Sequence, residues 1–138
     1  MYSRKVLLVT EAVQPVEGPT QTTIEAELLE RMLQSVFNEP AEQRRATAIA
    51  LLFTDDIVFT DAETTVTGRT ELAARVTALL AQGPGFTFSP AGPFRGVAGL
   101  GLRPWGLGPP GAEPVLGGLD VIEVVDGRIA KLWTMLDG

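Results

Sequence analysis

Two aspartates are the side chains best placed to do chemistry. Asp61 follows Ile57 and Phe59 at alternating positions of a predicted strand. Asp120 aligns in the same way with Ile122 on a second predicted strand. Alternate residues of a strand share one face, so each carboxyl is expected on an apolar sheet face. Ionisation is costly there unless the carboxylate is paired, so the pKa rises and the group becomes suited to proton transfer. The alternative is that each aspartate caps a loop in water at a strand end.

The residue types that the chain lacks exclude several classes of functional site. The 138 residues contain no His and no Cys, and the formal net charge is −6. Zinc fingers, haem-binding His, Cys nucleophiles, Ser-His-Asp triads and disulfides are therefore excluded. An acidic chain is poorly suited to phosphate backbones, and no apolar run approaches the ~18 residues of a membrane span. We expect no cofactor, no nucleic-acid partner, no membrane contact and, by elimination, a cytoplasmic location.

Two other sequence patterns are too weak to predict a binding site. Gly99-Leu100-Gly101 resembles a dinucleotide-binding turn, but Pro104 forbids the helix that would hold a pyrophosphate. An acidic group, Asp55, Asp56, Asp61 and Glu63, invites a Ca²⁺ or Mg²⁺ site. It lacks the central Gly and distal Glu of an EF-hand loop, and such acids are more often solvated caps. We predict no metal site.

Helices are predicted in the first half of the chain. Thr22-Thr23-Ile24-Glu25 is typical of a capping box with Thr22 as N-cap, and the apolar spacing behind it predicts an amphipathic helix through Phe37. Pro40 suits the first turn of a second helix, which runs to Phe53. Asp55-Asp56 is predicted to end that helix, before a short strand over 57–60.

A third helix is predicted to begin at Gly68 and to end at residues 82–85. The second half is different, because 18 of the 25 Gly and Pro residues lie between Gly83 and Gly118, which excludes regular helix there. Strands are predicted at 86–89, 97–103, 115–125 and 128–136, with a loop at 106–114 and a two-residue hairpin turn at Asp126-Gly127. Segregated helices and strands indicate an α+β fold.

The domain organisation follows from these elements. Residues 1–19 are predicted to be an N-terminal tail, whose 6–9 segment could add an edge strand, and residues 20–138 a single domain.

The predicted order of helices and strands resembles that of the nuclear-transport-factor-2-like superfamily, in its SnoaL-like and ketosteroid-isomerase-like branches. Three stretches of the sequence carry this resemblance. They are the helix-to-strand turn over 52–61, the helix entry over 66–72 and the closing hairpin over 118–129. The resemblance implies a curved antiparallel sheet wrapped by about three N-terminal helices into a cone with an internal pocket. The fold hosts enzymes, binders and dimerisation modules alike.

The resemblance also implies roles for the two aspartates. In ketosteroid isomerases the aspartate in the place of Asp61 is the general base, and the one in the place of Asp120 donates a hydrogen bond to the developing enolate. In SnoaL-type polyketide cyclases the aspartate on the last hairpin is the acid/base. The isomerase tyrosine is replaced by Leu33, so half of that oxyanion hole is missing. A limonene epoxide hydrolase, another relative, needs an Asp-Arg-Asp network; Arg103 could supply the arginine, but the water-positioning Tyr/Asn pair is not evident.

We therefore expect an apolar pocket around both aspartates. Its predicted lining is Phe59, Leu33, Ile122, Trp105, Arg103 and Leu132. Trp105 is either a pocket lid or a packing residue. Trp133 alternates with Leu132, so it is expected on the outer sheet face, where it favours a homodimer.

The predicted function is proton transfer on a small hydrophobic carbonyl compound, of isomerase or cyclase type, with Asp61 as base and Asp120 as acid or oxyanion partner. The alternatives are a non-catalytic binder of small apolar ligands and a plain dimerisation module of the same fold.

Overall fold

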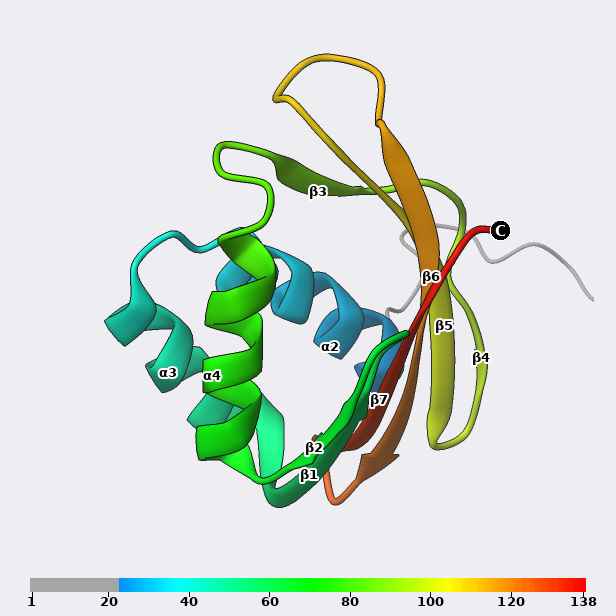
Figure 1. Cartoon of the computed structure of the whole chain (residues 1–138). Helices are drawn as coiled ribbons and strands as arrows, with labels where there is room; N and C mark the ends of the chain where they lie inside the picture. Colours follow the sequence, from blue (N-terminus) through cyan, green and yellow to red (C-terminus); the bar gives the residue numbers. More distant parts are fainter. Residues whose placement is uncertain (1–22) are drawn as a thin grey trace, which may run out of the picture.

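The computed structural model describes residues 23–138, so the predicted tail, its possible 6–9 strand and Thr22 lie outside the described residues. In this part of the chain, helices pack against one side of a curved, unclosed sheet (Figure 1). The helical elements are α2 (Ile24–Met32), a π-helical turn η1 (Leu33–Phe37), α3 (Glu42–Leu52) and α4 (Arg69–Leu80). The strands are β1 (Phe53–Thr60), β2 (Thr65–Thr67), β3 (Thr87–Pro90), β4 (Arg95–Val97), β5 (Leu100–Gly108), β6 (Leu116–Val125) and β7 (Arg128–Leu136). The predicted α+β class is confirmed.

The sheet is mixed rather than purely antiparallel, which corrects the expectation. Its strand order is β2-β1-β7-β6-β5-β3, with β4 paired to β5. β1 and β7 are parallel, whereas every other pair is antiparallel. The tight hairpin sets β7 antiparallel to β6, and the long chain between β1 and β7 puts no turn constraint on their relative direction.

Several element boundaries differ from the prediction. The N-cap of α2 is Thr23, whose hydroxyl accepts a hydrogen bond from the Ala26 N–H at 3.2 Å. Pro40 precedes α3, which has Ala41 as its N-cap. Asp55 does not end a helix, because α3 passes directly into β1 at Phe53.

Asp55 and Asp56 lie inside β1, where its register to β7 shifts and both side chains are exposed. The predicted strand over 97–103 is two strands, β4 and β5, joined through Gly99, which has φ +84°. The start of α4 after Gly68 and the β6–β7 hairpin are confirmed.

The core fills the space between the helices and the concave sheet face. It is built from buried apolar residues of both layers: Leu28, Leu29, Met32, Val36, Phe37, Ile49, Leu52, Phe53, Ile57, Phe59, Leu72, Val76, Ile122, Ile129 and Leu132. On β6, Asp120 and Ile122 are buried, whereas Val121 and Glu123 are only half-buried. The predicted register of this strand is therefore confirmed.

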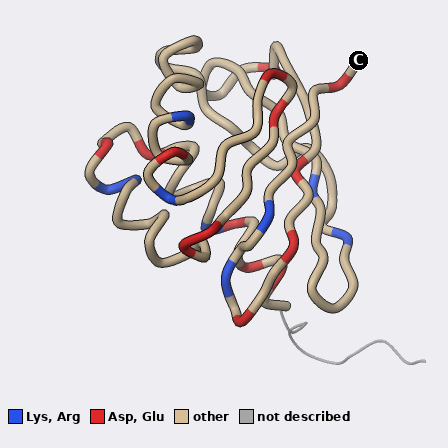
Figure 2. Tube along the Cα trace, turned by 60° about the horizontal axis from the view of Figure 1, so that its bottom comes forward, with Lys and Arg blue, Asp and Glu red and all other residues tan. Residues whose placement is uncertain are grey.

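Charges do not gather along one segment. Figure 2 shows Lys and Arg dispersed among Asp and Glu, with no basic run along the described chain. Among residues 23–138 no helix combines the length and apolar character needed to cross a membrane.

Candidate functional site

A cavity of about 300 Å³ opens between the concave sheet face and the helices. Its lining comes from η1, α4, the β1–β2 turn and strands β3, β5, β6 and β7: Leu33, Phe37, Asp61, Ala62, Glu63, Arg75, Leu79, Gln82, Gly83, Phe86, Phe88, Trp105, Leu107, Val115, Leu116, Asp120, Thr134 and Leu136. This volume is at the lower end of the ~300–1,000 Å³ typical of small-molecule sites. A mostly apolar wall with a few polar groups fits a small hydrophobic molecule.

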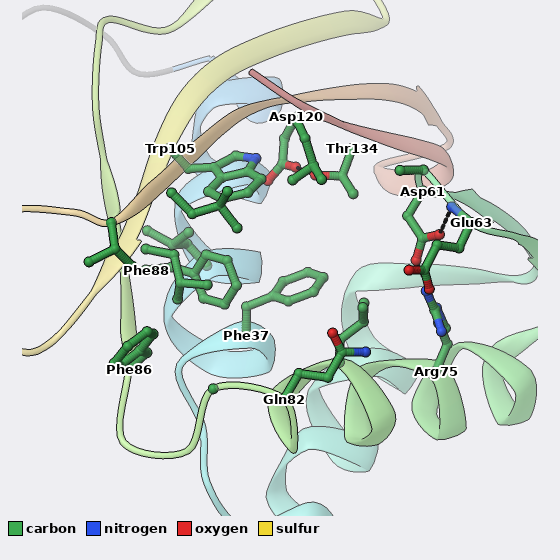
Figure 3. A pocket seen from close by; sticks show the side chains of 18 residues that line it. Phe37, Asp61, Glu63, Arg75, Gln82, Phe86, Phe88, Trp105, Asp120 and Thr134 are labelled. Atoms are coloured by element: carbon green, nitrogen blue, oxygen red, sulfur yellow. Dashed lines mark hydrogen bonds and ion pairs between the residues drawn. The ribbon is translucent and has the colours of Figure 1, made fainter. Parts of the chain in front are cut away.

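Aromatic rings form one wall (Figure 3). The rings of Phe37 and Phe88 meet edge-on with centroids 5.6 Å apart, and Phe88 meets Trp105 likewise at 5.4 Å. Asn38, at the end of η1, exchanges two hydrogen bonds with the Phe88 backbone: its Nδ2 donates to the carbonyl at 2.8 Å, and its Oδ1 accepts from the N–H at 2.7 Å. The π-helical turn is therefore fastened to β3, which holds this wall in place.

Asp120 is the buried carboxyl of the cavity. It lies in β6, 8% exposed, and its Oδ1 accepts a hydrogen bond from the hydroxyl of its cross-strand neighbour Thr134 at 2.5 Å. Burial raises the pKa of Asp120 to about 6, although the contacts with Thr134 and Trp105 and the charge of Arg103 lower it. A group with this pKa changes protonation state close to neutral pH.

Asp61 has a different environment. Its Oδ2 accepts from Arg75 Nε at 2.7 Å, and its Oδ1 accepts from the backbone N–H groups of Glu63 and Thr64 at 2.9 and 3.0 Å. Burial raises the pKa of Asp61, but these hydrogen bonds outweigh burial, and the pKa is below its ordinary value. The expectation that both aspartates have raised pKa values is therefore wrong for Asp61, because Arg75 of α4 reaches it.

Strand register explains how the two aspartates are arranged. Thr134 pairs with Asp120, and Asp61 follows Thr60, the partner of Trp133, so Asp61 and Asp120 lie on either side of β7. Their backbones are therefore about two strand spacings, or about 10 Å, apart. Among the described residues each carboxyl has its own hydrogen-bond partners and none joins the two. Figure 3 places them on different sides of the cavity.

The predicted pocket residues divide into two groups. Leu33 and Trp105 line the cavity. Phe59, Ile122 and Leu132 do not, because they form the next cross-strand row, which is fully buried in the core.

Arg103 is also not part of the lining. Its Nη1 donates to Glu30 Oε1 at 2.9 Å, which draws the side chain toward α2. The cavity is also lined by four residues that no local pattern in the sequence marks as site residues: Phe37, Arg75, Phe88 and Thr134. Within residues 23–138 no group of three or more metal-ligating side chains is found, and Asp61 and Glu63 instead hold Arg75.

Comparison with known proteins agrees with this architecture. The model of the SnoaL-like domain family matches residues 29–132. The chain belongs to the SnoaL-like family. The superfamily expected from the sequence is thus confirmed. No curated protein matches the chain.

Solved structures show the same SnoaL-like fold. A proposed isomerase of the SnoaL-like family from Agrobacterium tumefaciens is 26% identical, with a TM-score of 0.78 over 85% of this chain and 100% of the other. An LEH-like epoxide hydrolase from M. tuberculosis is 21% identical, with a TM-score of 0.63 over 84% of each chain. A proposed ketosteroid isomerase from Kribbella flavida is 16% identical, with a TM-score of 0.64 over 83% of this chain and 78% of the other. These reaction types differ, so the fold alone does not assign an activity.

Proposed function

We propose that the cavity binds a small, largely apolar carbonyl compound and that Asp120 transfers a proton to and from it. The observation that carries this proposal is the carboxyl of Asp120, which is buried in the wall of a mostly apolar cavity with its pKa raised to about 6. A base works best when its pKa lies close to the working pH, because it is then deprotonated yet still basic.

The proposed chemistry needs no additional reactant. The Asp120 carboxylate takes a proton from the carbon beside the carbonyl, and the C–H electron pair forms a C=C bond while the carbonyl π electrons move to oxygen. When the ligand also has a C=C bond between its β- and γ-carbons, Asp120, now a carboxylic acid, returns the proton to the γ-carbon. The enolate oxygen then re-forms the C=O bond, the electron pair between the carbonyl carbon and the α-carbon moves to the α,β position, and the β,γ π electrons bind the proton, which completes an isomerisation. In the cyclase alternative the enolate carbon attacks a second carbonyl, and the proton goes to the new alkoxide.

Asp61 is assigned a positioning role in this proposal instead of the role of base. Its oxygens already accept three hydrogen bonds, from Arg75, Glu63 and Thr64, and its side chain is 6% exposed. A carboxylate stabilised in this way is a weak base. It holds Arg75 at the edge of the cavity, next to Glu63.

The test is exchange of the α-hydrogens of 1-indanone in deuterated water, followed by proton NMR. This two-ring ketone is chosen because it is small, apolar and enolisable. We expect protein-catalysed exchange that Asp120→Asn reduces at least about 100-fold, the lower end of general acid–base contributions. Asp61→Asn removes the other buried carboxyl of the cavity and should reduce the exchange much less than Asp120→Asn does, because Asp61 only positions Arg75. Equal rates with the wild-type protein and Asp120→Asn would contradict the proposal, and binding without exchange would favour the non-catalytic binder.

A homodimer through the outer sheet face is a second part of the proposal. Trp133 and Val121 are cross-strand partners there, beside exposed Met135. An apolar face of this kind is typical of an interaction surface. The cytoplasmic location stays a prediction from composition.

A further inference from the structure

Trp105 carries a buried polar group that the chemistry above does not use. The residue is 6% exposed, and its indole Nε1 is buried without a hydrogen-bond partner among residues 23–138. Such groups are rare in folded proteins, because water is lost without a replacement partner. Trp105 lines the cavity, and Figure 3 shows its nitrogen at the end of the ring that faces Asp120.

The orientation of this indole is set by its neighbours. Trp105 and Gly118 are cross-strand partners, and a Cβ on Gly118 would lie 2.7 Å from Cε2 of the indole and collide with its Cζ2. Phe88 packs edge-on against the ring at a centroid distance of 5.4 Å. The ring is thus held between a glycine and an aromatic neighbour, which fixes the direction of the N–H bond.

The Asp120 carboxyl lies on the side of the ring where the indole nitrogen is (Figure 3). Trp105 is close enough to contribute to the electrostatics of Asp120, but the geometry is not that of a formed hydrogen bond. Oδ1 of Asp120 is held by Thr134 at 2.5 Å. An indole donor and a carboxyl therefore lie together in the wall of the cavity.

We propose that the Trp105 Nε1–H donates a hydrogen bond to the carbonyl oxygen of the ligand and so selects carbonyl compounds over hydrocarbons of the same shape. This inference rests on the proposed function of Asp120. An oxygen bound to Trp105 places the neighbouring carbon beside the Asp120 carboxylate. As Asp120 takes the proton, negative charge develops on the same oxygen and strengthens the hydrogen bond. Trp105 thus supplies a hydrogen-bond donor next to Asp120 in the wall of a mostly apolar cavity.

The experiment compares two ligands of nearly equal shape, 1-indanone and indane, which lacks the carbonyl oxygen. The chain has two tryptophans, so its ¹H–¹⁵N spectrum has two indole N–H signals. Trp133 lies on the outer sheet face and serves as the internal control. Trp105→Phe and Trp133→Phe assign the two signals and form a matched pair of variants that each remove one indole N–H.

We expect 1-indanone to move the Trp105 signal downfield, indane to move it much less, and the Trp133 signal to stay in place. Trp105→Phe should weaken 1-indanone binding about tenfold relative to indane, the contribution of one hydrogen bond. Trp133→Phe should leave that ratio unchanged. If Trp105→Phe fails to fold, the titration of the wild-type protein still decides, with Trp133→Phe providing the assignment.

Equal shifts of the Trp105 signal with both ligands, or no shift with either, would overturn the inference. The inference would also be overturned if Trp105→Phe binds 1-indanone and indane with the same affinity ratio as the wild-type protein while the pKa of Asp120 is higher. That result would show that the N–H serves only Asp120. The outcome is separable from that of the proposed function. Loss of exchange in Asp120→Asn with an unchanged ratio in Trp105→Phe refutes only the inference, whereas exchange that survives in Asp120→Asn refutes the proposed function.

Discussion

Replacing Asp120 with Asn should change how the free energy of unfolding depends on pH. The pKa of Asp120 rises from 3.8 to about 6 in the folded protein, mainly because the carboxyl is buried. Between pH 3.8 and about 6 the Asp120 carboxyl has lost its proton in the unfolded chain but keeps it in the folded protein. The free energy of unfolding therefore falls as the pH rises through this range. A shift of about 2 units corresponds to about 3 kcal/mol. Asn does not titrate, so the variant lacks this loss.

The assay is urea unfolding of the wild-type protein and Asp120→Asn between pH 4 and 7, at one protein concentration. We expect the stability of the variant relative to wild type to increase by about 2 kcal/mol across this range, because part of the full difference lies below pH 4, whatever constant offset the lost carboxyl contributes. Asp61→Asn provides a control of opposite sign. The lowered pKa of Asp61 means that its ionised form stabilises the folded protein above the unfolded pKa, and this contribution disappears as pH falls. A pH-independent difference for Asp120→Asn would refute the reasoning.

Three further outcomes are expected. Asn38→Ala removes both hydrogen bonds to the Phe88 backbone and should lower the free energy of unfolding in urea by about 2 kcal/mol. It should also weaken the binding of 1-indanone, and unchanged binding would show that the aromatic wall does not need these hydrogen bonds. Gly127→Ala should cost about 1 kcal/mol in thermal unfolding, because φ is +78° there, and an unchanged Tm would contradict it. Light scattering should give twice the mass of the 14.7 kDa chain, and Val121→Glu should return it to one chain; a wild-type mass of 14.7 kDa would exclude the dimer.

Elements with local signals were predictable from the sequence. Gly68 adopts φ +96° at the start of α4, and Asp126-Gly127 forms the hairpin turn with φ +51° and +78°. The alternation around Asp120 correctly predicted its buried face, because one face of β6 covers the core. The prediction that Asp55-Asp56 ends a helix is wrong. Two adjacent polar residues are typical of a helix end, but both of these lie exposed within β1.

The finer properties of the site depend on contacts distant in sequence. Arg75 lies 14 residues after Asp61 and reaches it only because α4 packs against β1. Asn38 and Phe88 are 50 residues apart and meet where η1 approaches β3. A repeating pattern of residue types along the sequence does not predict which distant residues will form such contacts. The aspartates were therefore chosen as candidates from local pattern and family resemblance, whereas their opposite pKa shifts required the tertiary structure.

The most direct test of the central claim is a ¹³C NMR titration of the aspartate carboxyls in the free protein, which needs no substrate. Asp120→Asn and Asp61→Asn assign the two signals. We predict a midpoint of about 6 for Asp120 and a midpoint below the ordinary range for Asp61. A midpoint for Asp120 near the ordinary value of ~3.9 would show a solvated carboxyl and contradict its assignment as the proton-transfer group.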